Sequence, residues 1–276
     1  MVQNGGSRTT GLPALLTECG CLVRVGFGSL LGGTAGKSGK GPGMRVAAPP
    51  VIPHARCMDA TPAPLAGTGA ALIGLAVSAV VMNPFLWPLV EDFNVMAHEA
   101  GHAVTGILLG FPPADVELNP DATGATSFPR SLCGLRGVMI AASGYLGPSM
   151  SGLGAAKLIE TGHVISVLWV ATIFLALLLL LIRRSFGLVS VPFAIVLLGV
   201  IMRYTHDGLE EAVSYAITWL LLLSGVRVAI ADGANAADAA NLSTMTHLPR
   251  QLWALLWLAG TLLAVIIGGK WMVLRT

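Results

Sequence analysis

Charged residues are scarce in this chain of 276 residues, because Asp, Glu, Lys and Arg together make up only 11% of it. Soluble domains carry about 25% charged residues. The hydrophobic share is 54%, and the mean hydropathy is +0.77. This composition excludes a secreted or nucleic-acid-binding protein, and a net charge of +2 excludes a strongly charged partner. We therefore expect a polytopic membrane protein surrounded by the lipid bilayer.

Cysteine is also scarce, with four residues and no C-x-x-C pair, so neither a zinc ribbon nor a thioredoxin-type motif is expected. A phosphate-binding loop is absent as well. Gly36-Lys37-Ser38 resembles the end of such a loop, but Leu31 stands where the loop requires its first glycine. The chemistry of the chain must be sought elsewhere.

The first 64 residues differ from the rest and predict a flexible, basic N-terminal tail. They are rich in Gly, Pro, Ser and Thr, and they carry six basic residues: Arg8, Arg24, Lys37, Lys40, Arg45 and Arg56. The apolar run at 21–31 is too short to cross a membrane. We expect the membrane domain to occupy residues 65–276.

Hydrophobic stretches of spanning length follow one another from Pro64 onward. They cover residues 66–88, 93–111, 136–158, 164–182, 186–202, 211–229 and 250–270. The fifth is short and polar residues interrupt the second, so six spans are as defensible as seven. The sequence thus predicts an all-α fold, a polytopic transmembrane helical bundle with six or seven spans.

Loop charges favour a cytoplasmic N-terminus, because basic residues gather on the inner side of membranes. In that orientation the inside holds the six basic residues of the tail and six others: Arg130, Arg136, Arg183, Arg184, Arg227 and Arg250. The outside holds four: Lys157, Arg203, Lys270 and Arg275.

The sequence His98-Glu99-Ala100-Gly101-His102 is an H-E-x-x-H motif inside the second hydrophobic stretch. On a helix, His98 and His102 project from one face, so both imidazoles can hold one zinc ion. Glu99 lies beside them, where it can take a proton from a zinc-bound water. Ionisable groups inside membrane spans are costly and usually functional. The motif therefore predicts a protease that cuts within or at the edge of the bilayer.

A catalytic zinc ion normally has three protein ligands, so the two histidines are not enough. The third must be an acidic or histidine residue on another span or at its end. Spacing alone does not choose among the candidates, which are His206, Asp207, Glu210, Glu211, Asp232, Asp238 and His247.

The segment after the motif, residues 111–131, predicts a small β-hairpin. Pro112-Pro113 stops the helix, residues 116–118 alternate with polar neighbours, and residues 121–124 are a turn signal before a return strand. Such a hairpin could offer an edge strand to an extended substrate; the alternative is an ordinary connecting loop. Asn119 and Asp121 are candidate substrate-binding residues that would steady the substrate backbone or the oxyanion. Gly144 and Gly147 would let a later span pack closely against the motif helix.

Several blocks of the chain follow one another in the order of a known family. HEAGHAVTGILLG is followed by NPDATGATS, then by AASGYLGPSMSG, and near the C-terminus by DAANLSTMTHLPRQLWALLWLAG. Together they resemble the site-2 protease family of membrane zinc metallopeptidases, and in particular a compact bacterial branch that lacks the usual inserted domains. The resemblance covers residues 90–274 and does not extend to the tail.

The resemblance implies that His98 and His102 are zinc ligands, that Glu99 is the general base, and that a distant aspartate is the third ligand. Better-known members carry that aspartate in an N-x-x-P…D-G context, which this chain lacks. In the compact branch the matching position is the first Asp of D-A-x-x-L…T-H-x-P, which is Asp238 here. Asp238 precedes an apolar stretch, where it can begin a helix and turn toward the core, or cap the helix and face water.

The expected function is hydrolysis of peptide bonds in membrane-embedded or membrane-bound proteins, by a zinc-activated water with Glu99 as general base. The alternative is a metal-binding membrane protein without protease activity, either a transporter or a degenerate protein that holds substrates. A membrane protein substrate is the expected partner, and a bacterial plasma membrane is the expected location. The identity of the substrate, the oligomeric state and any gating partner do not follow from the sequence.

Overall fold

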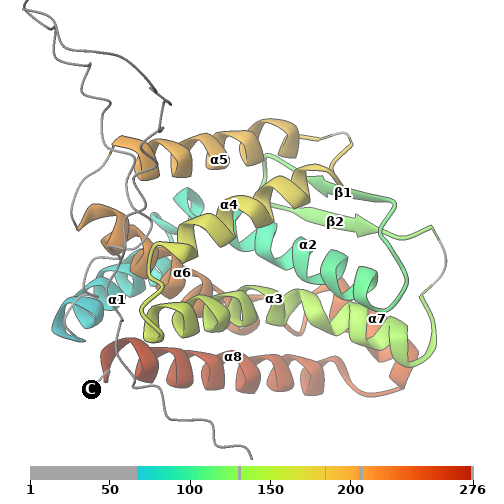
Figure 1. Cartoon of the computed structure of the whole chain (residues 1–276). Helices are drawn as coiled ribbons and strands as arrows, with labels where there is room; N and C mark the ends of the chain where they lie inside the picture. The colour runs from blue at the N-terminus through green and yellow to red at the C-terminus, as the bar shows by residue number, and fades with distance from the viewer. Residues whose placement is uncertain (1–66, 130–131, 184, 205–207, 275–276) are drawn as a thin grey trace, which may run out of the picture. The chain divides into compact units, whose positions relative to one another are not determined.

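The computed structural model describes residues 67–129, 132–183, 185–204 and 208–274. Over these residues the chain is mostly helical, with eight α-helices and one two-stranded β-hairpin (Figure 1). The predicted tail at 1–64 lies outside the described residues, as do Arg130, Arg184 and Arg275 of the charge analysis.

Seven helices coincide with the predicted hydrophobic stretches. They are α1 (Gly67–Met82), α2 (Glu91–Leu108), α3 (Gly134–Glu160), α4 (Ser166–Leu179), α5 (Gly187–Tyr204), α6 (Leu209–Ala231) and α8 (Arg250–Val273), and the short helix α7 (Ala237–Thr246) lies between α6 and α8. α1 ends earlier than expected because Pro84 follows it and the Asn83 carboxamide oxygen accepts the N–H of Phe85 (2.8 Å). A short 3₁₀ helix, η1 (Trp87–Leu89), completes the connection to α2.

The helices have the composition of a membrane protein, as predicted. Among the described residues, α5, α6 and α8 are long and apolar enough to cross a membrane, and α1 and α4 are apolar but shorter. Their outward faces carry large exposed apolar side chains, among them Leu72, Phe193 and Ile266. Such faces suit a lipid surrounding.

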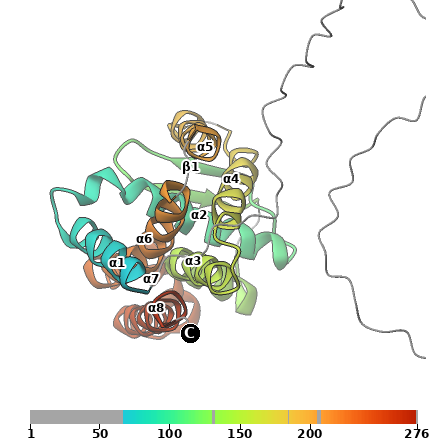
Figure 2. The same ribbon diagram turned by 60° about the vertical axis from the view of Figure 1, so that its left-hand side comes forward.

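Helix α3 is the centre of the packing, since it contacts α2, α6 and α8 (Figures 1 and 2). In both views α8 lies on one side of it and α2 and α4 on the other. Small residues bring α2 and α3 together: a methyl group on Gly101 would lie 2.8 Å from the Ser143 carbonyl oxygen, and one on Gly147 would lie 2.6 Å from the Ala97 carbonyl oxygen. The close approach predicted for the glycines of α3 is confirmed.

Helix α1 packs along α6 and α8 and begins where α8 ends. Gly67 lies directly against the carbonyl group of Val273, with no room for a side chain between them. Farther along α1, Gly74 faces the indole ring of Trp219, whose Nε1–H donates to the Ala70 carbonyl oxygen (3.0 Å). These contacts fix the start of the first helix and the end of the last at the same end of the bundle.

The predicted hairpin is confirmed. β1 (Asp115–Leu118) pairs antiparallel with β2 (Gly124–Ser127) directly after α2. The outer edge of β1 is already occupied, because the N–H of Val116 donates to the Leu181 carbonyl oxygen (3.2 Å) and the N–H of Leu118 donates to the Ser185 hydroxyl (3.3 Å). Within the described part of the chain the sheet has two strands, so the outer edge of β2 is its open edge.

Candidate metal centre and active site

Helix α2 presents both histidines of the motif on one face. His98 and His102 are one turn apart, and their Nε2 atoms lie 3.2 Å from each other. Gly144 on α3 leaves the space that they need, because a methyl group there would lie 2.3 Å from the Nε2 of His102 and 2.6 Å from that of His98. The imidazole rings of His98 and His102 therefore lie directly at the close contact between α2 and α3.

Asp238 joins the histidines from a segment more than a hundred residues away. It lies in the first turn of α7, and its Oδ2 is 3.2 Å from the Nε2 of His98 and 3.2 Å from that of His102. The three ligand atoms thus form a nearly equilateral triangle. Of the two orientations that the sequence left open, Asp238 takes the one toward the core.

This triangle fits a zinc ion. Zinc binds imidazole nitrogen and carboxylate oxygen at about 2.0–2.2 Å in a tetrahedral arrangement, which places its ligand atoms roughly 3.3 Å apart. The observed 3.2 Å matches that spacing, and two histidines with one carboxylate are a catalytic ligand set that leaves a fourth position for water. His102 is oriented further by its Nδ1, which lies 2.7 Å from the Ile140 carbonyl oxygen. An Nδ1–H that donates there leaves Nε2 free for a metal.

Aromatic side chains pack against the ring of His98. The ring of Tyr145 on α3 meets the His98 ring edge-on, with centroids 5.0 Å apart. Tyr145 in turn stacks on Trp257 of α8 at 4.2 Å, and the indole N–H of Trp257 donates to the Ala142 carbonyl oxygen (3.0 Å). His98 is thereby fixed to the two helices that carry these rings.

Glu99 is buried beside the histidines and is held by the hairpin. The hydroxyl of Thr126 donates to its carboxylate Oε2 (2.7 Å), and Glu99 is only 4% exposed. A methyl group on Gly124 would lie 2.7 Å from Oε1 of the same carboxylate. Sequence reasoning missed Thr126 and Gly124, although both stand in the block NPDATGATS and the alternation of a return strand places them on one face.

A cavity of about 520 Å³ opens at these residues, and we call it the polar cavity. Its walls come from α2, the hairpin, α3 and α7, and they include the two histidines, Glu99 and Asp238. Asn94, one turn before His98, also lines it and is 5% exposed. The arrangement combines a metal-binding group, a buried carboxylate and room for a ligand, which is the set of parts that metal-assisted hydrolysis requires.

The structure places the candidate substrate-binding residues away from the metal group. Asn119 and Asp121 are exposed in the turn of the hairpin, and neither lines the polar cavity. Both bond to Thr123: the Asn119 amide donates to its hydroxyl (3.1 Å), and that hydroxyl donates to Asp121 (2.7 Å). The bond from Thr123 lowers the pKa of the Asp121 carboxyl below its ordinary value. Their predicted contact with a substrate remains a prediction.

The other candidates for the third ligand do not join the histidines. Among the described residues, His98, His102 and Asp238 form the one group with metal-binding spacing. Asp232 is exposed at the end of α6, Glu210 and Glu211 are buried in its first turn, and His247 is exposed after α7. His206 and Asp207 lie outside the described residues.

Comparison with known families gives one match. The model of a family described as Peptidase M50B-like matches residues 71–268, which include the H-E-x-x-H motif, the hairpin and Asp238. No curated protein and no solved structure matches significantly.

Proposed function

We propose that this chain, which belongs to the Peptidase M50B-like family, is an intramembrane zinc metalloprotease. Its expected substrates are membrane-embedded or membrane-bound proteins. The membership confirms the predicted resemblance to site-2 proteases and makes the chain a metallopeptidase by family. Zinc as the metal, Glu99 as the general base and the intramembrane substrate are the parts that we add.

One observation carries the proposal. The Nε2 atoms of His98 and His102 and the Oδ2 atom of Asp238 lie 3.2 Å from one another, and the buried carboxylate of Glu99 lines the same cavity. Ionisable side chains inside apolar helix bundles are costly, and they usually mark a functional site. Three metal-binding side chains beside the buried carboxylate of Glu99 suit hydrolysis better than metal transport.

The residues of this chain would divide the work as follows. A zinc ion bound to the three ligands would lower the pKa of a water molecule toward the neutral range and would polarise the peptide carbonyl. Glu99 would accept the proton of the attacking water and would return it to the leaving amine. The Ile140 carbonyl holds the tautomer of His102, and the lack of a side chain at Gly144 leaves room for both imidazole rings.

The substrate must be extended where it is cut, because a helical peptide bond is shielded and its carbonyl is already hydrogen-bonded. The open edge of β2 lies at the rim of the polar cavity and can pair with such an extended segment by strand addition. Asn119 and Asp121 would contact the substrate only beyond this segment, since they lie at the tip of the turn.

The chain would cross the membrane of a bacterial cell six times. Gly67 packs against Val273, so α1 begins on the side of the bundle where α8 ends. Alternating crossings give that arrangement only when their number is even, which favours six over seven. With the loops of Arg136, Arg183 and Arg250 in the cytoplasm, Gly67 lies on the outer side. The tail that precedes Gly67 lies outside the described residues, so the predicted cytoplasmic N-terminus stays a prediction.

The experiment that tests the proposal is the zinc content of the detergent-purified protein. Wild type is measured beside His102→Ala and Asp238→Ala, with Glu99→Gln as the variant that keeps the ligands. We expect about one zinc per chain in wild type and in Glu99→Gln, and strong loss in the two ligand variants.

Cleavage of single-span fusion proteins then separates the remaining readings. Loss of cleavage in Glu99→Gln with zinc retained would support the protease. Retention of zinc in Asp238→Ala would exclude Asp238 as third ligand, and a wild type without zinc after reconstitution would overturn the proposal. A zinc-loaded wild type that cleaves none of the fusions would favour the metal-binding protein without protease activity.

A further inference from the structure

The hairpin does more than follow the metal-binding helix, because it makes a direct hydrogen bond to the general base. The Thr126 hydroxyl lies 2.7 Å from Oε2 of Glu99 and 3.2 Å from the main-chain oxygen of the same residue. Within the described residues, no other side chain makes a hydrogen bond to that carboxylate. A hydrogen bond to an ionised group is stronger than one between neutral groups, so this contact restricts the side chain of Glu99.

The face of β2 that carries Thr126 fits closely against the carboxylate. Alternate residues of a strand point to the same side, so Gly124 and Thr126 share this face. A methyl group on Gly124 would lie 2.6 Å from Cγ and 2.7 Å from Oε1 of Glu99. Glycine thus leaves room for the carboxylate, and threonine supplies the donor.

The backbone of the same two residues lies at the open edge of the sheet. Val116 and Leu118 direct their N–H groups away from β2, toward Leu181 and Ser185. Val116 is opposite Thr126, and Leu118 is opposite Gly124. In an antiparallel pair, residues opposite such positions also direct their own N–H and C=O groups outward. Thr126 therefore offers its hydroxyl to Glu99 and its main chain to the edge where a further strand can pair.

We propose that Thr126 is a positioning residue that sets the carboxylate of Glu99 relative to a substrate strand paired with β2. This inference rests on the proposed function. A substrate that pairs along β2 takes its register from the main chain of Gly124 and Thr126, and the Thr126 side chain fixes the proton acceptor in the same frame. Strand β2 thus aligns both the peptide bond to be cut and the carboxylate of Glu99, the proposed general base.

The test replaces the hydroxyl while it keeps the shape and the main chain. Thr126→Val removes the donor, Thr126→Ser keeps it, and Ser127→Ala is the matched control, since Ser127 is the next residue of β2 and is exposed. Each variant is purified whole, its zinc is measured, and kcat and KM are determined with the single-span fusion protein that wild type cleaves fastest. Loss of a hydrogen bond to a charged group predicts a roughly 10- to 100-fold fall in kcat for Thr126→Val.

The expected pattern is a lower kcat with unchanged KM and unchanged zinc in Thr126→Val, and activity near that of wild type in Thr126→Ser and Ser127→Ala. A double variant adds the link to the base: in a Glu99→Asp background the shorter carboxylate no longer reaches the hydroxyl, so Thr126→Val should cause no further loss. A full additional loss there would mean that Thr126 acts elsewhere.

Three further results would overturn the inference. They are an unchanged kcat in Thr126→Val, a Thr126→Ser as slow as Thr126→Val, and a parallel loss of zinc or rise in KM, which would indicate a structural role. Cleavage by Glu99→Gln at the wild-type rate would overturn the proposed function itself, and the role of Thr126 with it.

Discussion

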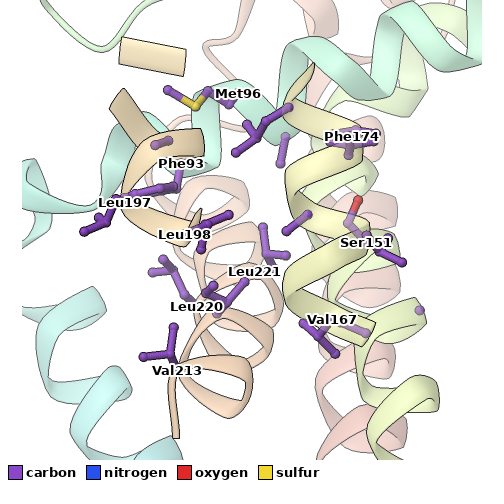
Figure 3. A pocket seen from close by; sticks show the side chains of 18 of the residues that line it. Phe93, Met96, Ser151, Val167, Phe174, Leu197, Leu198, Val213, Leu220 and Leu221 are labelled. Carbon is purple, nitrogen blue, oxygen red and sulfur yellow. The ribbon is translucent and has the colours of Figure 1, made fainter. Parts of the chain in front are cut away.

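Two cavities of nearly equal volume lie on opposite faces of α2. The polar cavity measures about 520 Å³, and a second one, which we call the apolar cavity, measures about 530 Å³. The apolar cavity is bounded by α2 to α6, and Figure 3 shows Phe93 and Met96 of α2 and Leu220 and Leu221 of α6 among the side chains that line it. On α2, residues 93, 96 and 97 face it, whereas residues 94, 98, 99 and 102 face the other.

The two linings differ far more than the two volumes. Among the residues that line the apolar cavity, Ser151 has the only polar side chain. The lining of the polar cavity includes two histidines, Glu99 and Asp238. Volume therefore does not locate the chemistry of this molecule, whereas the polar groups do, because each of them costs free energy in an apolar surrounding.

The largest effect should follow from Glu99→Gln, which changes the polar cavity by one atom. General base catalysis contributes about 10²–10⁴-fold, so we expect kcat to fall about a thousandfold. Zinc should stay bound, because the proposed ligands His98, His102 and Asp238 are unchanged. Cleavage and zinc content, measured on the same preparation, check the predicted kcat and the predicted zinc binding. A Glu99→Gln variant that still cleaves at the wild-type rate would mean that the carboxylate in the polar cavity is not needed for the reaction.

A smaller effect is expected from Gly144→Ala, which narrows the polar cavity where α3 meets the histidines. The added methyl group would lie 2.3 Å from the Nε2 of His102, so the ring must move and zinc affinity should fall about 10- to 100-fold. Gly154→Ala is the matched control on the same helix, because nothing lies within 4 Å of the methyl group that it adds. Competition with a chelator measures the affinity, and equal affinities in the two variants would contradict the prediction.

The smallest effect should come from Ser151→Ala, which makes the lining of the apolar cavity wholly apolar. The Ser151 side chain lines the apolar cavity, whereas His98, His102 and Asp238 line the polar cavity on the opposite face of α2. Zinc content and kcat should therefore stay within about twofold of wild type, as for surface substitutions away from a site. A large loss of cleavage would mean that the apolar cavity takes part in the reaction.

The sequence predicted the parts of the site that are local. Residues four apart on a helix share a face, so His98 and His102 followed from the motif, and the turn signal at 121–124 located the hairpin. Asp238, the proposed third ligand, is 136 residues from His102, and no periodicity connects the two. Asp238 was singled out by resemblance, and its place beside the histidines depends on how α7 packs on α3.

Other features could not be predicted because they depend on tertiary contacts. Thr126 is an ordinary strand residue in sequence, and its bond to Glu99 exists only because β2 folds back over α2. The early end of α1 was visible in principle, since Pro84 interrupts the stretch at 66–88, but hydropathy continues through the proline. Local chemistry was thus easier to predict than the contacts that position it.

The capped outer edge of β1 has a consequence for turnover. With β1 bonded to the Leu181–Ser185 connection, the hairpin can accept one extended segment at a time, along β2. In the proposed mechanism, the fragment that retains its pairing with β2 after cleavage would still occupy that position and would prevent the next substrate from binding. In the proposed mechanism the enzyme is therefore inhibited by its own product, and the rate at which that fragment leaves sets an upper limit on kcat.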